Sequence, residues 1–180
     1  VEWSKQILDA LHYLHSQSPP VIYRDMKPGN VMLRTSDSRI LLVDFGIART
    51  VVQDSDKVMT VIGTPAYAPD ELFQGKPEER SDLYSLGATM HCLLTGVVPV
   101  TPFSFKPLRE LNPDVSEELE AIVMKALSMK IEDRYRNAKE MKESLVKLPE
   151  YYEETEITLP RMISEGSSLP QTEKPLLIPT

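Results

Sequence analysis

Apolar residues in the first part of the chain recur at the spacing of one helix face. Trp3, Ile7 and Leu11 lie four positions apart, and the pattern stops before the Ser-Pro-Pro stretch at 18–20. This period, followed by two prolines, predicts a helix at about 1–17.

Three short runs, at 21–23, 31–33 and 40–43, are apolar and contain β-branched residues. Polar segments with Pro, Gly or Ser-Asp-Ser separate them, which is typical of short strands joined by loops. We therefore expect three short strands around a loop at 24–30. The segment 44–71 has no sustained period, and loops of that length are usually functional or disordered.

The second half of the chain has the pattern of a helical domain. Residues 83–94 are apolar on most sides, which indicates a buried helix, and Gly96 is expected to end it. After a Pro-rich connection at 97–113, Ser116 can cap a further helix. The spacing of apolar residues predicts a last helix at about 137–147.

Composition and length indicate a single domain. The 180 residues are 41% hydrophobic, which suffices for one core, and the net charge of −7 argues against nucleic acid or an anionic membrane as a partner. Beyond residue 148 the chain is acidic and then rich in Pro, Ser and Thr. We expect one domain at 1–148 and a poorly ordered tail or linker at 149–180.

Cysteine and histidine usage indicates core residues and not a metal site. Cys92 has no partner for an intrachain disulfide and lies in an apolar run, so we interpret it as a buried thiol in a reducing compartment. His12 and His15 lie three apart, but no further ligand set completes a metal site, so we interpret both as packing or surface residues. No stretch reaches the roughly 18 apolar residues of a membrane helix, so we expect a cytoplasmic protein.

Two motifs carry candidate chemistry. The loop 23–30 reads YRDMKPGN, and DFG follows the third apolar run at 44–46. Together, in this order and context, they resemble the catalytic loop H-R-D-x-x-x-x-N and the D-F-G triplet of protein kinases. Tyr23 stands where the family usually has histidine, which keeps an aromatic ring to pack beneath Phe45; Gly46 completes the triplet.

The resemblance implies a role for each residue of these motifs. Asp25 would accept the proton of the substrate hydroxyl, and Lys27 would reach the transferring phosphate, as in serine/threonine kinases. Asn30 and Asp44 would bind Mg²⁺, with Mn²⁺ as an alternative, on the phosphates of ATP. Met32 would form the floor under the adenine.

A segment at 63–71 resembles the end of a kinase activation segment, although its A-P-E triplet is imperfect. By this resemblance Thr64 and Tyr67 would line the peptide-substrate site. Glu71 would pair with Arg134. Asp82, at the start of the buried helix, would brace the backbone of the catalytic loop.

Arg24 precedes the catalytic aspartate, so the resemblance implies a partner for its cation in the active state. A phosphorylated residue of the activation loop provides it in many kinases. Thr60 is the first candidate, followed by Thr50 and Ser55. The alternative, that each is only a polar loop residue, stays equally open.

The resemblance therefore implies a kinase-like fold represented by its C-terminal lobe only, mainly α-helical with a few short strands around the catalytic loop. The sequence is similar to bacterial serine/threonine kinases of the cyanobacterial kind. No Gly-rich strand pair and no lysine strand occur in 1–180, so we expect that N-terminal lobe before Val1. This segment alone is then expected to catalyse little, and a membrane anchor after Thr180 stays open.

Two other functions remain as alternatives. One is a small-molecule phosphotransferase with a kinase-like fold, against which Lys27 and the segment 63–71 argue. The other is a pseudokinase or adaptor lobe that only binds partners, against which the intact Asp25, Asn30 and Asp44 argue. The expected partner is a protein substrate with serine or threonine.

Overall fold

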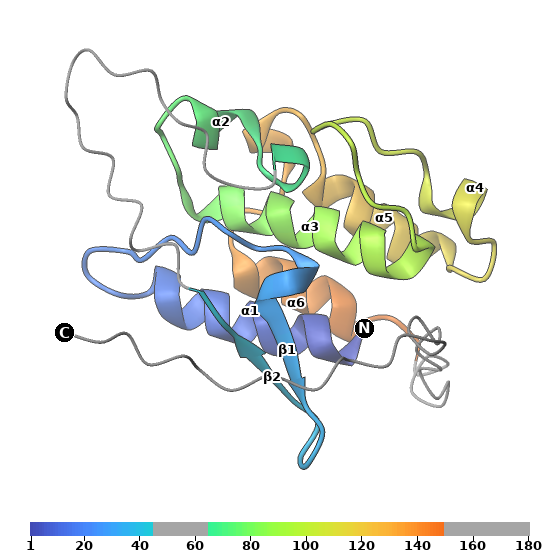
Figure 1. The fold of residues 1–180 in the computed structure, drawn as a ribbon, viewed down its shortest axis with the longest axis horizontal. Coiled ribbons are helices and arrows are strands. Elements are labelled where there is room, and N and C mark those ends of the chain that lie inside the picture. The colour runs from blue at the N-terminus through green and yellow to red at the C-terminus, as the bar shows by residue number, and fades with distance from the viewer. Residues whose placement is uncertain (45–64, 150–180) are drawn as a thin grey trace, which may run out of the picture.

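The fold consists of helices around one buried helix, with a two-stranded hairpin at its edge (Figure 1). A computed structural model describes residues 1–44 and 65–149. The helices are α1 (Glu2–His15), α2 (Asp70–Phe73), α3 (Glu79–Thr95), α4 (Leu108–Leu111), α5 (Glu117–Ala126) and α6 (Ala138–Val146). Short 3-10 turns are η1 (Pro28–Asn30), η3 (Pro65–Tyr67) and η4 (Ile131–Asp133).

Helix α3 forms the centre of the core and contacts α1, α4, α5 and α6. Glu78 and Ser81 close a capping box at its start, and Gly96 ends it in the left-handed conformation with φ 71°. Every residue from Ser81 to Cys92 is buried. A helix buried on all sides has no polar face, as the sequence pattern predicts.

Helix α5 packs tightly against α3 because Gly87 has no side chain. A Cβ at Gly87 would lie 3.0 Å from the Cβ of Ala126 and 3.3 Å from Leu127. The predicted cap is present, since the Ser116 hydroxyl accepts a hydrogen bond from the Leu119 N–H at 3.1 Å.

The hairpin pairs β1 (Val31–Arg34) with β2 (Arg39–Leu42) in antiparallel register, Val31 opposite Leu42. It contacts α1 along β2, where Gln6 accepts from the Ile40 N–H at 2.9 Å. The hairpin follows directly on the loop 24–30, so it fixes where that loop ends.

The strand expected at 21–23 is wrong. The Tyr23 N–H donates to the carboxylate of Asp82 at 2.8 Å, and the Val21 N–H donates to the Leu14 carbonyl at 3.0 Å. These donors are therefore taken by a side chain and a helix end. Among residues 1–44 and 65–149, the strands β1 and β2 pair with each other and not with this run. The Pro-rich connection also contains α4, a single helical turn that the sequence did not predict.

The last predicted helix is present as α6, capped by Asn137, whose side chain accepts from the Glu140 N–H. Within residues 1–44 and 65–149, no helix has the length and apolar character needed to span a membrane. The expected tail at 149–180 falls almost wholly outside the described residues, so that boundary stays a prediction.

Candidate functional site

One buried carboxylate of α3 binds the backbone at the start of the loop 24–30. Asp82, fully buried near the start of α3, accepts hydrogen bonds from the backbone N–H groups of Tyr23 and Arg24, both at 2.8 Å. The expected contact of Asp82 with the loop backbone is thus present. It fixes the two residues immediately before Asp25.

Arg24 adopts a backbone conformation that a residue with a side chain seldom takes, with φ 68°. Left-handed conformations cost free energy and persist only where surrounding contacts impose them. Here the two bonds to Asp82 supply that constraint. The turn at Arg24 then directs the next side chain, Asp25, toward η1.

Two side chains of the loop contact Asp25. The Asn30 amide nitrogen donates to the Asp25 carboxylate and to its backbone carbonyl, each at 2.8 Å. The Lys27 ammonium lies 3.1 Å and 3.3 Å from the two carboxylate oxygens. Asp25 is 6% exposed, so its carboxylate has a fixed orientation and faces a cation.

Asp44 is brought toward this cluster through its neighbour Val43. The Val43 N–H donates to the Asn30 carbonyl at 3.0 Å, and the Tyr23 hydroxyl donates to the Val43 carbonyl. Asp44 itself is exposed and has φ 57°. The chain at the end of β2 is therefore bound on both sides to the loop that carries Asp25.

The pKa of Tyr23 reflects the negative charges that lie near the loop. The pKa of Tyr23 is raised to about 12, mainly by burial and in addition by the negative charges of Asp25, Asp44 and Asp82. The hydroxyl consequently stays protonated and remains a donor to Val43. Asp25, Asp44 and Asp82 thus all lie close enough to Tyr23 to affect its ionisation.

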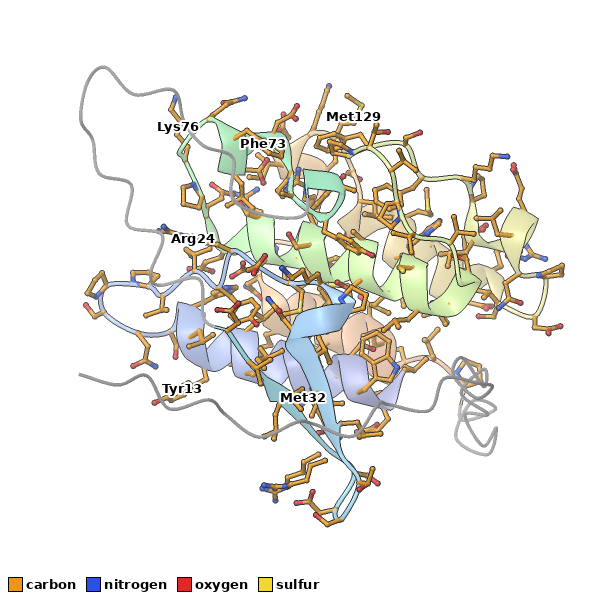
Figure 2. All side chains as sticks on the ribbon, in the orientation of Figure 1. Tyr13, Arg24, Met32, Phe73, Lys76 and Met129 are labelled. Atoms are coloured by element: carbon orange, nitrogen blue, oxygen red, sulfur yellow. The ribbon has the colours of Figure 1, made fainter. Side chains whose placement is uncertain are left out.

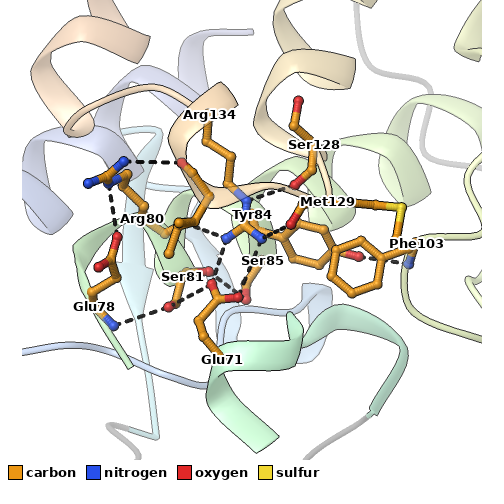
Figure 3. Close-up of polar contacts among 11 residues, drawn as sticks. Glu71, Glu78, Arg80, Ser81, Tyr84, Ser85, Phe103, Ser128, Met129 and Arg134 are labelled. Atoms are coloured by element: carbon orange, nitrogen blue, oxygen red, sulfur yellow. Dashed lines mark hydrogen bonds and ion pairs between the residues drawn. The ribbon is translucent and has the colours of Figure 1, made fainter. Parts of the chain in front are cut away.

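Glu71 and Arg134 form the ion pair that the sequence led us to expect (Figure 3). The closest nitrogen and oxygen lie 2.6 Å apart, and the Arg134 side chain is fully buried. The Ser81 hydroxyl donates to the same carboxylate at 2.9 Å, and the guanidinium also donates to the carbonyls of Ser128 and Met129. This network ties α2 to α3 and η4.

Other candidate residues lie apart from the cluster or outside the described part. Met32, labelled on β1 in Figure 2, is 54% exposed. Tyr67 is 7% exposed, and its hydroxyl donates to the sulfur of Cys92 at 3.3 Å, so most of its side chain packs inside the core. The candidates that fall outside the described residues are Phe45, Gly46, Thr50, Ser55, Thr60 and Thr64.

His15 also supports this site, which its sequence pattern did not predict. Its Nε2 forms a 2.8 Å hydrogen bond with the same oxygen of Asp82 that holds Tyr23, and the ring is buried. The two residues are 67 positions apart, so spacing gave no signal. His12, in contrast, is exposed, and within the described residues no cluster of ligands for a metal ion is found.

Comparison with known proteins adds an independent line of evidence. A family model described as the protein kinase domain matches residues 1–164. The serine/threonine-protein kinase PknA of Nostoc sp. is 38% identical over 150 residues, which cover 77% of this chain and 26% of the relative. PknB of Mycobacterium tuberculosis is 36% identical over 155 residues, covering 77% and 24%.

Solved structures resemble the fold over a similar range. The crystal structure of the Mycobacterium tuberculosis PknI kinase domain superposes with a TM-score of 0.62 at 30% identity, covering 81% of this chain and 53% of that one. The apo form of PpkA-294 gives 0.65 at 31% identity, covering 78% and 51%. The chain therefore spans about a quarter of these curated relatives and about half of these solved chains.

Proposed function

Since the chain belongs to the protein kinase family, we propose that its loop 24–30 transfers the γ-phosphate of ATP to serine or threonine side chains of a protein. The observation that carries this proposal is the cluster in which Asp25 is oriented by Asn30 at 2.8 Å and faces Lys27 at 3.1 Å. Phosphoryl transfer depends mainly on positioning and on charge neutralisation, and this cluster supplies both.

Asp25 would act as the proton acceptor. Its carboxylate is held by Asn30 and is little exposed, so a substrate hydroxyl that donates to it would lie in one defined direction. A positioned general base contributes about 10²- to 10⁴-fold to a rate. Lys27, whose side chain is 24% exposed, would reach the transferring phosphate while staying beside Asp25.

Asn30 and Asp44 would hold Mg²⁺, with Mn²⁺ as the alternative. The Asn30 nitrogen is committed to Asp25, which leaves its carbonyl oxygen as the atom that can bind a cation, and the Asp44 carboxylate is exposed. Both are hard oxygen donors of the kind that Mg²⁺ prefers. The metal would supply neutralisation of phosphate charge during transfer.

We further propose that this chain is the C-terminal lobe of the kinase and that an N-terminal lobe of the same protein covers the hairpin. Met32 of β1 and Leu41 of β2 are cross-strand partners on one face of the hairpin, and they are 54% and 42% exposed. Apolar side chains gathered at one edge favour a covering partner. Met32 would then lie under the adenine, between the two lobes.

Arg24 supports a regulatory proposal. Its Nε is buried and has no hydrogen-bond partner among residues 1–44 and 65–149. A buried guanidinium nitrogen without a partner is costly, and a phosphate group satisfies it with charge-assisted bonds. We propose that phosphorylated Thr60 provides that phosphate in the active state.

A protein substrate is favoured over a small alcohol by the Glu71–Arg134 network. This pair anchors the chain that follows 63–67, where Thr64 and Tyr67 would line a peptide site. A rigid anchor there suits recognition of an extended peptide more than of a compact molecule.

We also propose a cytoplasmic location for this part of the protein, because the proposed reaction consumes ATP.

The test is a phosphotransfer assay with the full-length protein, ATP and Mg²⁺. Serine and threonine peptides should accept phosphate, whereas small alcohols such as choline should accept little. Preference for the small alcohols would favour the small-molecule phosphotransferase. Binding of ATP with no transfer to any acceptor would favour the pseudokinase.

A further inference from the structure

A groove of about 510 Å³ runs between α1 and α6, away from the residues assigned to phosphoryl transfer. Its apolar residues are Leu8, which is fully buried, and Val146, which is 58% exposed and supplies accessible apolar surface. Exposure of a valine beside a hollow leaves an apolar surface that a further segment could cover.

The rim of this groove is basic along α6. Lys139, Lys142 and Lys147 line it, against Asp9 and Glu143. With His12 neutral, these groups leave a net charge of +1, in a chain whose net charge is −7. The groove is therefore a locally positive site on an acidic protein.

Two of these lysines are available for a new partner. Lys142 is already paired with Asp9 at 2.6 Å across the groove. Lys139 and Lys147 are exposed, and neither forms an ion pair or side-chain hydrogen bond with any residue of 1–44 or 65–149. They lie toward the two ends of α6, so they could hold both ends of one short segment.

The segment that follows α6 has the complementary chemistry. Residues 150–156 read EYYEETE, with four glutamates, two tyrosines and no lysine or arginine. Helix α6 ends at Val146, and Pro149 cannot continue it. The chain thus leaves the helix immediately beside the groove.

The segment is long enough to cover the groove. From Lys147 back to Lys139 the helix rises about 12 Å at 1.5 Å per residue. An extended chain covers about 3.3 Å per residue, so roughly four residues span that length. Residues 150–154 therefore suffice, and they contain both tyrosines and three of the four glutamates.

We propose that residues 150–156 fold back along α6 and bind in the α1–α6 groove of the same molecule. Tyr151 and Tyr152 would cover the exposed Val146, and the glutamates would pair with Lys139 and Lys147. The expected linker would then begin after this bound segment. The proposal is independent of kinase activity, so it stands or falls separately from the proposed function.

Hydrogen exchange of residues 150–156 in the full-length protein tests the proposal, with a synthetic peptide of the same sequence as reference. Bound residues should exchange at least about tenfold more slowly than the free peptide. Exchange at the free-peptide rate would overturn the proposal. Protection that increases with protein concentration would also overturn it, because the groove would then bind a second copy.

Reversing the charge of the groove lysines tests whether residues 150–156 bind in this groove and not elsewhere. In the double variant Lys139→Glu/Lys147→Glu the protection should be lost, and adding Glu150→Lys/Glu153→Lys should restore it. The matched control Lys106→Glu/Lys130→Glu makes the same change of charge at exposed lysines outside the groove and should keep the protection. Equal protection in the groove variant and the control would overturn the proposal.

Discussion

The two sides of the loop 24–30 differ in how fully other residues of this chain bury and contact them. On the α3 side, Asp82 is fully buried and all its described contacts are short hydrogen bonds, to Tyr23, Arg24 and His15. On the hairpin side, Met32 is more than half exposed.

This difference indicates which functions of the proposed kinase depend on this chain alone and which need a further part of the protein. The chain by itself positions Asp25, the proposed proton acceptor, and anchors the segment that leads to the proposed peptide site. The surface proposed for the adenine is present but uncovered among the described residues. Substitutions on the α3 side should therefore affect folding or chemistry, and those on the hairpin side should affect nucleotide binding.

The largest expected effect is on catalysis by Asp25. Asp25→Asn in the full-length protein should lower kcat for peptide phosphorylation about 100- to 10,000-fold, because the amide cannot take a proton. Affinity for ATP should be nearly unchanged. Asp37→Asn, at an exposed carboxylate in the hairpin turn, is the matched control and should keep full activity. Equal activity of the two variants would remove Asp25 from the mechanism.

Asp82 should show the largest effect on stability. Asp82→Ala leaves two backbone N–H groups and the His15 ring buried without their acceptor, so the free energy of unfolding should fall by about 3–5 kcal/mol. Urea unfolding measures it. Asp37→Ala should change the free energy of unfolding far less than Asp82→Ala does, since its pair with Arg34 is exposed. A small loss for both would mean that the α3 side does not hold the loop.

Tyr84 of α3 should make stability fall at alkaline pH. Burial raises the pKa of Tyr84 to about 12. Between pH 10 and 12 the unfolded chain loses this proton and the folded chain keeps it, so about 2 kcal/mol of stability should disappear over that interval.

Tyr84→Phe should remove that part of the pH dependence. At neutral pH it should cost about 1 kcal/mol, because the Phe103 N–H loses its acceptor. Tyr13, which is 67% exposed, provides the control, and Tyr13→Phe should leave the alkaline slope unchanged. The same slope in all three proteins would contradict the burial of Tyr84.

The smallest effect is expected on the hairpin side. Met32→Ser should raise the KM for ATP roughly tenfold with kcat little changed, because the adenine loses an apolar contact. Met129→Ser, at a methionine that is 72% exposed near η4, should change neither constant (Figure 2). If both substitutions leave KM unchanged, the hairpin is not the nucleotide face.

Sequence patterns predicted those parts of the fold that depend on local periodicity. The buried helix α3, its end at Gly96 and the cap at Ser116 all follow from residues within one turn of the feature. The run at 21–23 was misassigned because its β-branched residues favour extended backbone, but only tertiary structure decides whether a partner strand exists.

The sequence predicted those residues of the site that lie close together along the chain. Asp25, Lys27 and Asn30 lie within one loop, and the structure brings them into contact. The role of His15 was not predictable, because its hydrogen bond to Asp82 joins two helices that only the fold brings together. Periodicity could identify His15 as a residue on α1, not as a support for the loop.

The most direct test of the account is a crystal structure of the full-length protein with Mn²⁺ and a non-hydrolysable ATP analogue. The account predicts a metal ion bound by the side-chain oxygen of Asn30 and the Asp44 carboxylate. The terminal phosphate should lie beside Lys27, with room for a substrate hydroxyl between it and Asp25. A metal ion and triphosphate bound elsewhere, with Asn30 and Asp44 free of both, would contradict it.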